Sequence, residues 1–297
     1  MGHRNDIMTK LFCFGLGYSA EALARRLATA GWTIAGTART PEGVARIASF
    51  GYEAILFDGL TAAPQGTASL ESATHVLISA SPDEQGDPVL RLHGDDLARA
   101  ANLRWIGYLS TIGVYGNSDG QWIDETTTPQ PRAERTRRRL EAENGWLAFG
   151  EASGKRVQVF RLGGIYGPGR SVVDDLRDGT ARRIVKPNQV FNRIHVEDIA
   201  TVLAAAANGA GRESVYNVTD DEPSPSQDVI LLAARLMGVE APPEIPFETA
   251  DLSPMARSFY ADNRRVRNRR LHDDLGVTLA FPTYREGIAG ILAGTEG

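Results

Sequence analysis

One ten-residue stretch, 11–20 (LFCFGLGYSA), constrains the fold more than any other part of the chain. Its first four residues are apolar and predict a buried strand. The next ten, 21–30, have apolar residues at the spacing of a helix, and Gly31 follows where a helix would end. A strand, a glycine-rich turn and a helix in this order are the context in which a dinucleotide-binding turn is found.

The two glycines of this stretch fit the G-x-G-x-x-[GA] pattern of such a turn. Gly15 permits a tight turn, Gly17 has no Cβ that would keep a pyrophosphate from the backbone, and Ala20 takes the third position. An ordinary strand-to-helix turn is the alternative. The strand that follows favours dinucleotide binding, with phosphates at the helix N-terminus. The expected contacts are Gly15, Leu16, Gly17, Tyr18, Ser19 and Ala20.

The second expected strand, 33–39, suggests which dinucleotide is bound. NAD-selective sites place an acidic residue near the end of this strand, and 35–40 contains none. Arg39 stands there instead, flanked by Thr37 and Thr40. A guanidinium at this place can pair with the 2′-phosphate of NADP, so we expect NADP in preference to NAD. The alternative is a solvated arginine after a strand.

Three further strands are expected: one at 54–57, one that forms 76–82 together with its exit turn, and one at 104–111. Helical segments such as 88–101 separate them. Strands that alternate with helices predict an α/β fold with a parallel, doubly wound sheet. The turns after the third and fourth strands should pass the cofactor. We expect Asp58 and Gly59 near the adenine, and Ala80 and Ser81 near the phosphate–ribose region.

Composition excludes several classes of protein. The net charge of −5 argues against general nucleic-acid binding. Cys13 is the single cysteine, so no disulfide can form within the chain, which fits a cytoplasmic location. No segment approaches 18 consecutive apolar residues, and no cysteine–histidine pattern suggests a metal site. We expect residues 1–8 to be an extension outside the fold.

Motifs along almost the whole chain carry a resemblance to a known family. They are 110–116 (STIGVYG), 124–125 (DE), 161–170 (RLGGIYGPGR), 193–200 (RIHVEDIA), 216–220 (YNVTD), 264–268 (RRVRN), 275–276 (LG) and 282–287 (PTYREG). In order and spacing the chain resembles extended short-chain dehydrogenases/reductases, the group of NAD(P)-dependent epimerases and dehydratases. The resemblance implies a Rossmann-type domain over 9–165. It also implies a smaller C-terminal α/β substrate lobe over 166–297, interrupted by returns to the sheet at about 190–220.

The resemblance also implies roles for individual residues. Thr111 matches the family's serine or threonine that hydrogen-bonds the reacting oxygen. Arg135 stands where the family has its catalytic tyrosine, and Arg139 stands where it has a lysine. Because arginine stays protonated, Arg135 cannot transfer the proton, although Arg139 could donate to a ribose hydroxyl. The chain thus resembles the atypical subgroup, in which an aspartate replaces an active-site asparagine; Asp95 and Asp96 are both candidates.

Three other side chains could replace the missing acid–base group. Tyr115 and Tyr166 carry phenols near the expected cleft, and His195 has a suitable ordinary pKa. In the resembling family, however, all three belong to turns with packing roles, and the histidine caps a helix. We therefore expect them to be structural.

The second half should contain helices at 172–180, 198–207, 227–236 and 284–293, and a hairpin formed by 184–187 and 190–194. Basic residues in this half are solvated, or they bind an anionic substrate such as a sugar nucleotide. The candidate substrate contacts are Ser81, Tyr166, Arg170, Arg193 and Arg257. The resemblance also implies a homodimer through helices at 88–101 and 133–149.

Two functions from different classes remain open. The first is an NADP-dependent oxidoreductase or epimerase that acts on a small polar or nucleotide-sugar-like substrate. The second is a catalytically inactive NADP-binding sensor or regulatory protein, which the arginines at 135 and 139 favour. A structural protein without a cofactor is the least favoured, because it would leave the phosphate-binding turn without a purpose.

Overall fold

A computed structural model describes residues 8–294. It divides into two compact units. Unit 1 comprises 1–110, 133–160 and 203–215, and unit 2 comprises 111–132, 161–202 and 216–297, each within the described residues. Residues 1–7 of the expected extension lie outside the described part, and the side chain of Met8 is largely exposed. The predicted division at residue 165 stays a prediction about independent domains.

A seven-stranded sheet dominates unit 1, in the order β11-β7-β5-β4-β1-β2-β3. Its strands are β1 (Lys10–Phe14), β2 (Thr33–Ala38), β3 (Glu53–Leu56), β4 (His75–Ile78), β5 (Trp105–Thr111), β7 (Arg156–Leu162) and β11 (Val215–Val218). β1 pairs in parallel with β2 on one side and with β4 on the other. The order reverses next to β1, which makes this a doubly wound, Rossmann-type sheet and confirms the expected fold class.

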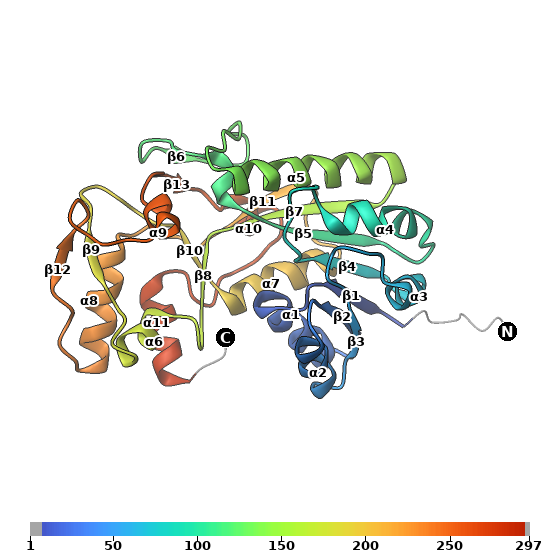
Figure 1. Ribbon diagram of the computed structural model, residues 1–297, viewed down its shortest axis with the longest axis horizontal. Coiled ribbons are helices and arrows are strands. Elements are labelled where there is room, and N and C mark those ends of the chain that lie inside the picture. The colour runs from blue at the N-terminus through green and yellow to red at the C-terminus, as the bar shows by residue number, and fades with distance from the viewer. Residues whose placement is uncertain (1–7, 295–297) are drawn as a thin grey trace. The chain divides into compact units, whose positions relative to one another are not determined.

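Helices cover both faces of this sheet, since right-handed crossovers to the two sides of β1 leave helices on opposite faces. The helices of unit 1 are α1 (Tyr18–Thr29), α2 (Pro41–Ser49), α3 (Pro64–Ser72), α4 (Pro88–Arg99) and α5 (Glu134–Ser153). In Figure 1, α1 and α2 lie below the strands, and α4 and α5 lie above them. The central strand β1 is apolar because both of its faces are buried: Leu11 to Phe14 have no exposed surface.

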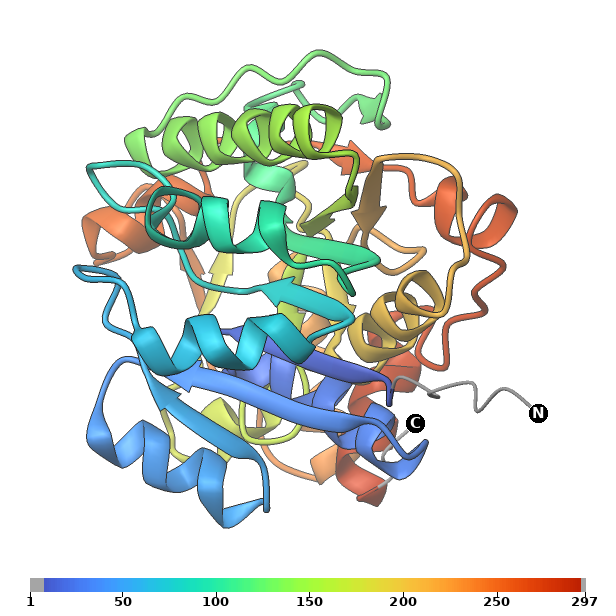
Figure 2. The ribbon, with the colours of Figure 1, turned by 90° about the vertical axis from the view of Figure 1, so that its right-hand side faces the viewer.

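Unit 2 contains three small parallel pairs of strands, β8–β10, β9–β12 and β6–β13. The bounds are β6 (Trp122–Ile123), β8 (Gly164–Tyr166), β9 (Arg183–Val185), β10 (Arg193–His195), β12 (Glu244–Pro246) and β13 (Arg265–Val266). The helices are η1 (Ile112–Tyr115, a 3₁₀ helix), α6 (Val172–Arg177), α7 (Val196–Ala207, whose last residues belong to unit 1), α8 (Ser226–Met237), α9 (Pro254–Phe259), α10 (Arg269–Asp273) and α11 (Tyr284–Ala293). The yellow to red ribbons of Figure 2 follow most of these elements.

The predicted hairpin at 184–194 is wrong. β9 pairs with β12 and β10 pairs with β8, so neither strand pairs with the other. Asn188 does lie in a turn, with φ at 61°. The loop between the strands is bonded to a distant segment instead: Gln189 Nε2 donates to the Asp262 carbonyl at 2.9 Å, and Asn192 Nδ2 donates to the Arg264 carbonyl at 3.0 Å.

Three helices of unit 2, α6, α8 and α11, pack against one another. Their shared core contains Val173, Val229, Ala233, Tyr284 and Ile288. α11 begins with a capping box, in which the Thr283 side chain accepts from the backbone and Glu286 reaches back to the cap. These helices form a separate small core.

Candidate functional site

The glycine turn after β1 is held by β2. The Gly15 N–H donates to Thr37 Oγ1 at 2.8 Å, and the Leu16 N–H donates to the Thr37 carbonyl at 2.9 Å. Gly15 has φ at 83°, and a Cβ there would lie 3.2 Å from the Ala80 backbone nitrogen. The turn is therefore rigid, and it requires glycine for both conformation and space. The predicted contact Thr37 is buried and organises the turn.

The second glycine leaves room for a ligand. Gly17 is the N-cap of α1, no side chain caps the helix there, and a Cβ on Gly17 would meet nothing within 4 Å. The Glu21 carboxylate in the first turn is paired with Arg46, whose Nη2 also donates to the Leu16 carbonyl at 2.8 Å. The backbone of α1 is thus open to an anion, and the nearby negative charge is neutralised.

A second glycine contact was not foreseen from the sequence. The Leu16 side chain packs over Gly36 of β2, where a Cβ would lie 2.5 Å from Leu16 Cδ1. A glycine inside a strand often marks such a close approach, so Gly36 was the available signal. This contact fixes the middle residue of the turn.

The two residues after β2, Arg39 and Thr40, differ in their contacts. The Thr40 side chain caps α2 by accepting from the Gly43 N–H at 3.2 Å. Arg39 is exposed and makes no ion pair within the described residues. The parallel pairing of β1 with β2 places Arg39 at the same edge of the sheet as the glycine turn. Of these three residues, Thr37 is buried, Thr40 caps α2, and Arg39 is exposed.

The turns after β3 and β4 reach the same edge. Asp58 is exposed, and its Oδ1 accepts from the Leu60 N–H at 2.8 Å. Gly59 has φ at 86°, and a Cβ there would lie 3.3 Å from Pro88. The Ala80 N–H donates to the Phe14 carbonyl at 3.0 Å, so the loop after β4 is fixed beside β1. Ser81 then stands exposed at the start of that loop.

Arg139 of α5 ties the ends of two strands together. Its Nη2 donates to Ser81 Oγ at 3.0 Å and its Nη1 donates to the Leu109 carbonyl at 2.8 Å. The guanidinium also lies 5.8 Å from the centre of the Tyr108 ring. A half-buried, fixed positive charge therefore stands where β4 and β5 end. Arg135, one helical turn earlier, is exposed.

Asp87 is a residue of this region that the sequence motifs did not indicate. It caps α4 with Oδ1, which accepts from the Val89 and Leu90 N–H groups at 3.0 and 2.9 Å. Burial raises the pKa of Asp87, and the charge of Arg139 opposes that rise. The Asp-Pro pair that opens a helix was a readable signal.

Asp95 and Asp96 differ in surroundings. Asp96 contacts His93 and Thr67, at 3.0 Å each, and Arg99 at 2.8 Å. These bonds hold α3 against α4. Asp95 is exposed. The environment of Asp96 is structural, and neither side chain is positioned by a contact that suggests chemistry.

In unit 2, Thr111 begins the 3₁₀ helix η1. Its Oγ1 accepts from the Gly113 N–H at 3.1 Å, and the side chain is half-buried. Tyr115, at the other end of η1, is buried and donates to Asn217 Oδ1 at 2.8 Å. Burial raises the pKa of Tyr115, although Arg161 lies 4.8 Å from its ring centre. Tyr115 thus acts as a hydrogen-bond donor in a packed cluster.

Tyr166 and His195 lie against each other, with ring centres 5.2 Å apart. His195 has no exposed surface, and its Nδ1 accepts from the Glu197 N–H at 3.3 Å at the start of α7. Burial lowers the pKa of His195 to about 4, so it stays neutral at physiological pH. The Tyr166 hydroxyl is buried and has no hydrogen-bond partner among the described residues. The geometry of His195 is that of a helix cap.

The three candidate substrate arginines lie in different surroundings. Arg170 is exposed in a turn closed by its backbone bonds to Gly167. Arg257 is exposed on α9, and its Nη2 donates to the Ala250 carbonyl at 3.0 Å. Arg193 is mostly buried on β10, and its Nη1 donates to Ser224 Oγ at 2.8 Å. Tyr166 and Arg193 line one cavity, and Arg170 and Arg257 do not.

Neither a metal-binding cluster nor a membrane-spanning helix is found among the described residues. No group of three or more histidine, cysteine, aspartate and glutamate side chains in 8–294 is arranged to hold a metal ion. Over the same residues, no helix combines the length and the apolar character needed to cross a membrane.

Comparison with known proteins gives relatives along most of the chain, although no family model matches it. Protein YeeZ of Escherichia coli strain K12 is 27% identical over 244 residues, which are 79% of this chain and 86% of YeeZ. A 3-diazoavenalumate denitrifying reductase of Streptomyces sp is 30% identical over 143 residues, 44% of this chain and 45% of the reductase.

Solved structures match over nearly the full length. A functionally unknown conserved protein from Silicibacter pomeroyi DSS is 50% identical, with a TM-score of 0.90, and the match covers 98% of this chain and all of that one. A putative NAD-dependent epimerase/dehydratase from Methylobacillus flagellatus is 26% identical, with a TM-score of 0.71, and covers 97% and 99%. MoeE5 in complex with UDP-glucuronic acid and NAD is 21% identical, with a TM-score of 0.73 over 94% and 96%, and supports the fold.

The parallel sheet, the glycine turn at its switch point and these full-length structural matches agree with one another. The chain therefore has a Rossmann-type fold similar to that of NAD-dependent epimerase/dehydratase family members, consistent with an extended or atypical short-chain dehydrogenase/reductase.

Proposed function

We propose that this protein binds NADP and is an oxidoreductase or epimerase-like enzyme that acts on a small polar or nucleotide-sugar-like substrate. One observation carries the proposal: α1 begins at Gly17 without a side-chain cap and with open space above it. The exposed Arg39 at the same edge of the sheet favours the 2′-phosphorylated dinucleotide. The names of two relatives, a reductase and an epimerase/dehydratase, support this chemistry.

The residues present fit a nicotinamide dinucleotide. The backbone of α1 would hold the diphosphate, and the fixed guanidinium of Arg139 would donate to a ribose hydroxyl. When bound, the nicotinamide ring supplies a group that gives or accepts a hydride. The protein's task is then to hold the two reactants in register, which by itself accounts for much of a catalyst's effect.

Thr111 is the residue proposed to orient the reacting oxygen. Its Oγ1 accepts the Gly113 N–H and keeps its own hydrogen for donation. Arg135 holds its proton at all ordinary pH values, so we propose a proton-transfer group other than the family's tyrosine. The buried, hydrogen-bonded phenol of Tyr115 has a raised pKa, which makes it a poor base.

The test mixes the purified protein with NADPH and a panel of aldehydes, ketones and nucleotide sugars. Turnover that Thr111→Val reduces by about 100-fold or more, and that Thr111→Ser retains, supports an oriented reacting oxygen. Both variants should keep the wild-type melting temperature within a few degrees, since only one cap bond changes. Turnover that Thr111→Val leaves unchanged would contradict the role of Thr111.

The second function is a catalytically inactive NADP sensor or regulatory protein. The observation that favours it is the pair of arginines, Arg135 exposed and Arg139 bonded to Ser81 and Leu109. Tight NADPH binding with no turnover over the whole panel would select this function. Rapid turnover of any carbonyl substrate would exclude it.

A further inference from the structure

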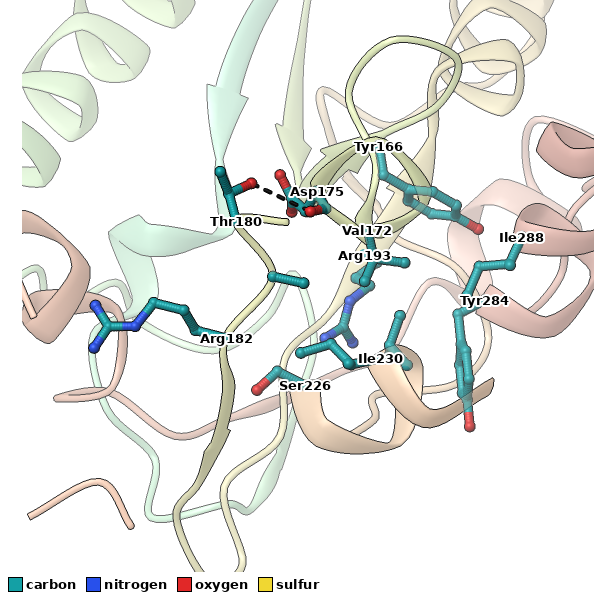
Figure 3. Close-up of a pocket in the computed structure, with 12 residues that line it drawn as sticks. Tyr166, Val172, Asp175, Thr180, Arg182, Arg193, Ser226, Ile230, Tyr284 and Ile288 are labelled. Carbon is teal, nitrogen blue, oxygen red and sulfur yellow. Dashed lines mark hydrogen bonds between the residues drawn. The ribbon is translucent and has the colours of Figure 1, made fainter. Parts of the chain in front are cut away.

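Unit 2 contains a cavity that the proposed cofactor site does not explain. It has a volume of about 430 Å³. Most of its lining residues belong to α6, α8, α11 and β10, and Figure 3 draws their side chains. Its apolar wall comes from Val172 of α6, Val229 and Ile230 of α8, and Ile288 of α11. This volume is within the range of small-molecule sites, and a mostly apolar wall with few polar groups is typical of them.

One positive charge is built into this cavity. Arg193 Nη1 donates to the Phe191 and Ser224 carbonyls at 3.1 and 3.0 Å and to Ser224 Oγ at 2.8 Å. These bonds use one end of the guanidinium and hold it in place. The side chain still lines the cavity, and it appears among the lining residues in Figure 3. A guanidinium fixed in this way is pre-organised for a planar anion such as a carboxylate.

Two acidic groups, Asp220 and Asp175, lie near this charge. Asp220 is 1% exposed, and neither of its carboxylate oxygens has a hydrogen-bond partner within the described residues. Burial raises the pKa of Asp220 well above its usual value, and the charge of Arg193 opposes that rise. Asp175 lines the cavity as well, and burial and two nearby aspartates raise its pKa. Arg182 is also a lining residue, but its guanidinium points away from Arg193 in Figure 3 and donates to the Asp251 carbonyl.

The lining also contains a tyrosine whose hydroxyl lies against Gly287 of α11. The Tyr166 hydroxyl is buried and unpartnered within the described residues, and Tyr166 lines the cavity. An unpartnered buried hydroxyl costs stability, so a ligand that accepts its hydrogen bond would recover that cost. The cavity therefore combines a fixed cation, a spare O–H donor and an apolar wall.

We propose that this cavity is a binding site for a small organic carboxylate with an apolar body. The carboxylate would pair with Arg193 and accept from the Tyr166 hydroxyl. The apolar body would lie on the side chains of α8 and α11. The site uses unit 2 alone, so this proposal does not depend on NADP binding.

The test uses three probes of one shape: 3-phenylpropionate, 3-phenylpropanamide and 3-phenylpropylamine. Calorimetric titration of the full chain should show the carboxylate binding at least tenfold more tightly than the neutral amide, with the amine weakest. Tyr166→Phe should weaken the carboxylate about fivefold and leave the melting temperature equal or higher, because the hydroxyl has no partner to lose. This variant separates binding from folding.

Two further variants complete the design. Ala181→Trp, at a half-buried lining residue in a loop, should fill the cavity and abolish carboxylate binding. Arg177→Gln removes an exposed positive charge of α6 that does not line the cavity, and should change affinity by less than twofold. Equal affinity for the three probes, no carboxylate binding up to about 10 mM, or binding that Ala181→Trp leaves intact would overturn the proposal. A parallel NADPH titration reports on the proposed function separately.

Discussion

Arginine chemistry dominates the account at the scale of single residues. Arg39 is exposed and unpaired within the described residues, whereas Arg139 is fixed by Ser81 and by the Leu109 carbonyl. A guanidinium can bind phosphate or ribose but cannot release a proton at ordinary pH. The same residue type thus supports nucleotide binding and argues against the family's usual proton transfer.

Replacing Arg39 tests the choice of cofactor. Arg39→Asp should raise the NADPH dissociation constant roughly 30-fold or more, because a charge-assisted contact is lost and a repulsion is added. The NADH constant should change less than about threefold. Fluorescence titration with both nucleotides measures this. Arg104→Asp, at an exposed arginine before β5, is the matched control, and equal effects on both nucleotides would exclude the assignment.

His195 gives a prediction about pH. Its folded pKa of about 4 lies below the ordinary value of 6.5, so the unfolded chain binds the proton first. Its contribution to stability is complete above pH 6.5 and is lost as the pH falls toward 4, by roughly 3 kcal/mol in all.

Urea unfolding from pH 7.5 to 4.5 measures this dependence. His195→Asn, which can still accept the Glu197 N–H, should lose less stability than the wild type over this range. Because the other titrating groups, including the buried His75, are present in both proteins, the difference isolates His195. Parallel curves would show that its protonation does not contribute.

At the scale of elements, the two glycines of the first turn should behave differently. Gly15 has a positive φ and a close backbone neighbour, whereas Gly17 has φ at −98° and open space. Gly15→Ala should destabilise the fold by about 1–3 kcal/mol. Gly17→Ala should keep the melting temperature within about 2 °C and weaken NADPH at least tenfold.

Thermal unfolding and calorimetric titration of the two variants test this contrast. Gly94→Ala, in the middle of α4 where a Cβ makes only an ordinary contact, is the control for a glycine substitution that should leave NADPH binding unchanged. NADPH binding that survives Gly17→Ala would contradict a diphosphate at this helix.

The main sheet could be predicted because its strands are short, apolar and separated by amphipathic helices. The last helix, 284–293, was predicted from the same periodicity. The hairpin at 184–194 was not a hairpin, since β9 and β10 pair with strands distant in sequence. Local patterns report turns such as that of Asn188, but they carry no information about which distant strand supplies the partner.

In the candidate site, too, local features could be predicted from the sequence, whereas contacts with distant residues could not. The glycine turn was readable because each position has a local backbone requirement. The structural duties of Thr37 and Thr40, which hold a turn and cap a helix, depend on neighbours and were not foreseen. A glycine within a strand (Gly36) and an Asp-Pro pair (Asp87) are visible in the sequence. The packing of Leu16 on Gly36 and the cap formed by Asp87 can be recognised only once the fold is known.

At the scale of the whole molecule, the residues proposed to bind the nucleotide and those proposed to contact the substrate or a carboxylate lie in different units. Unit 1 carries the turn and the arginines proposed for the nucleotide, and unit 2 carries Thr111 and the carboxylate cavity. The expected homodimer through 88–101 and 133–149, the cytoplasmic location and the choice between enzyme and sensor stay predictions.

The most direct test of the central claim is a crystal structure of the protein grown with NADPH. We expect a diphosphate on the backbone amides at the start of α1, above Gly17, with the 2′-phosphate at Arg39. A nucleotide bound elsewhere, or a turn occupied by the protein's own side chains at saturating NADPH, would contradict it.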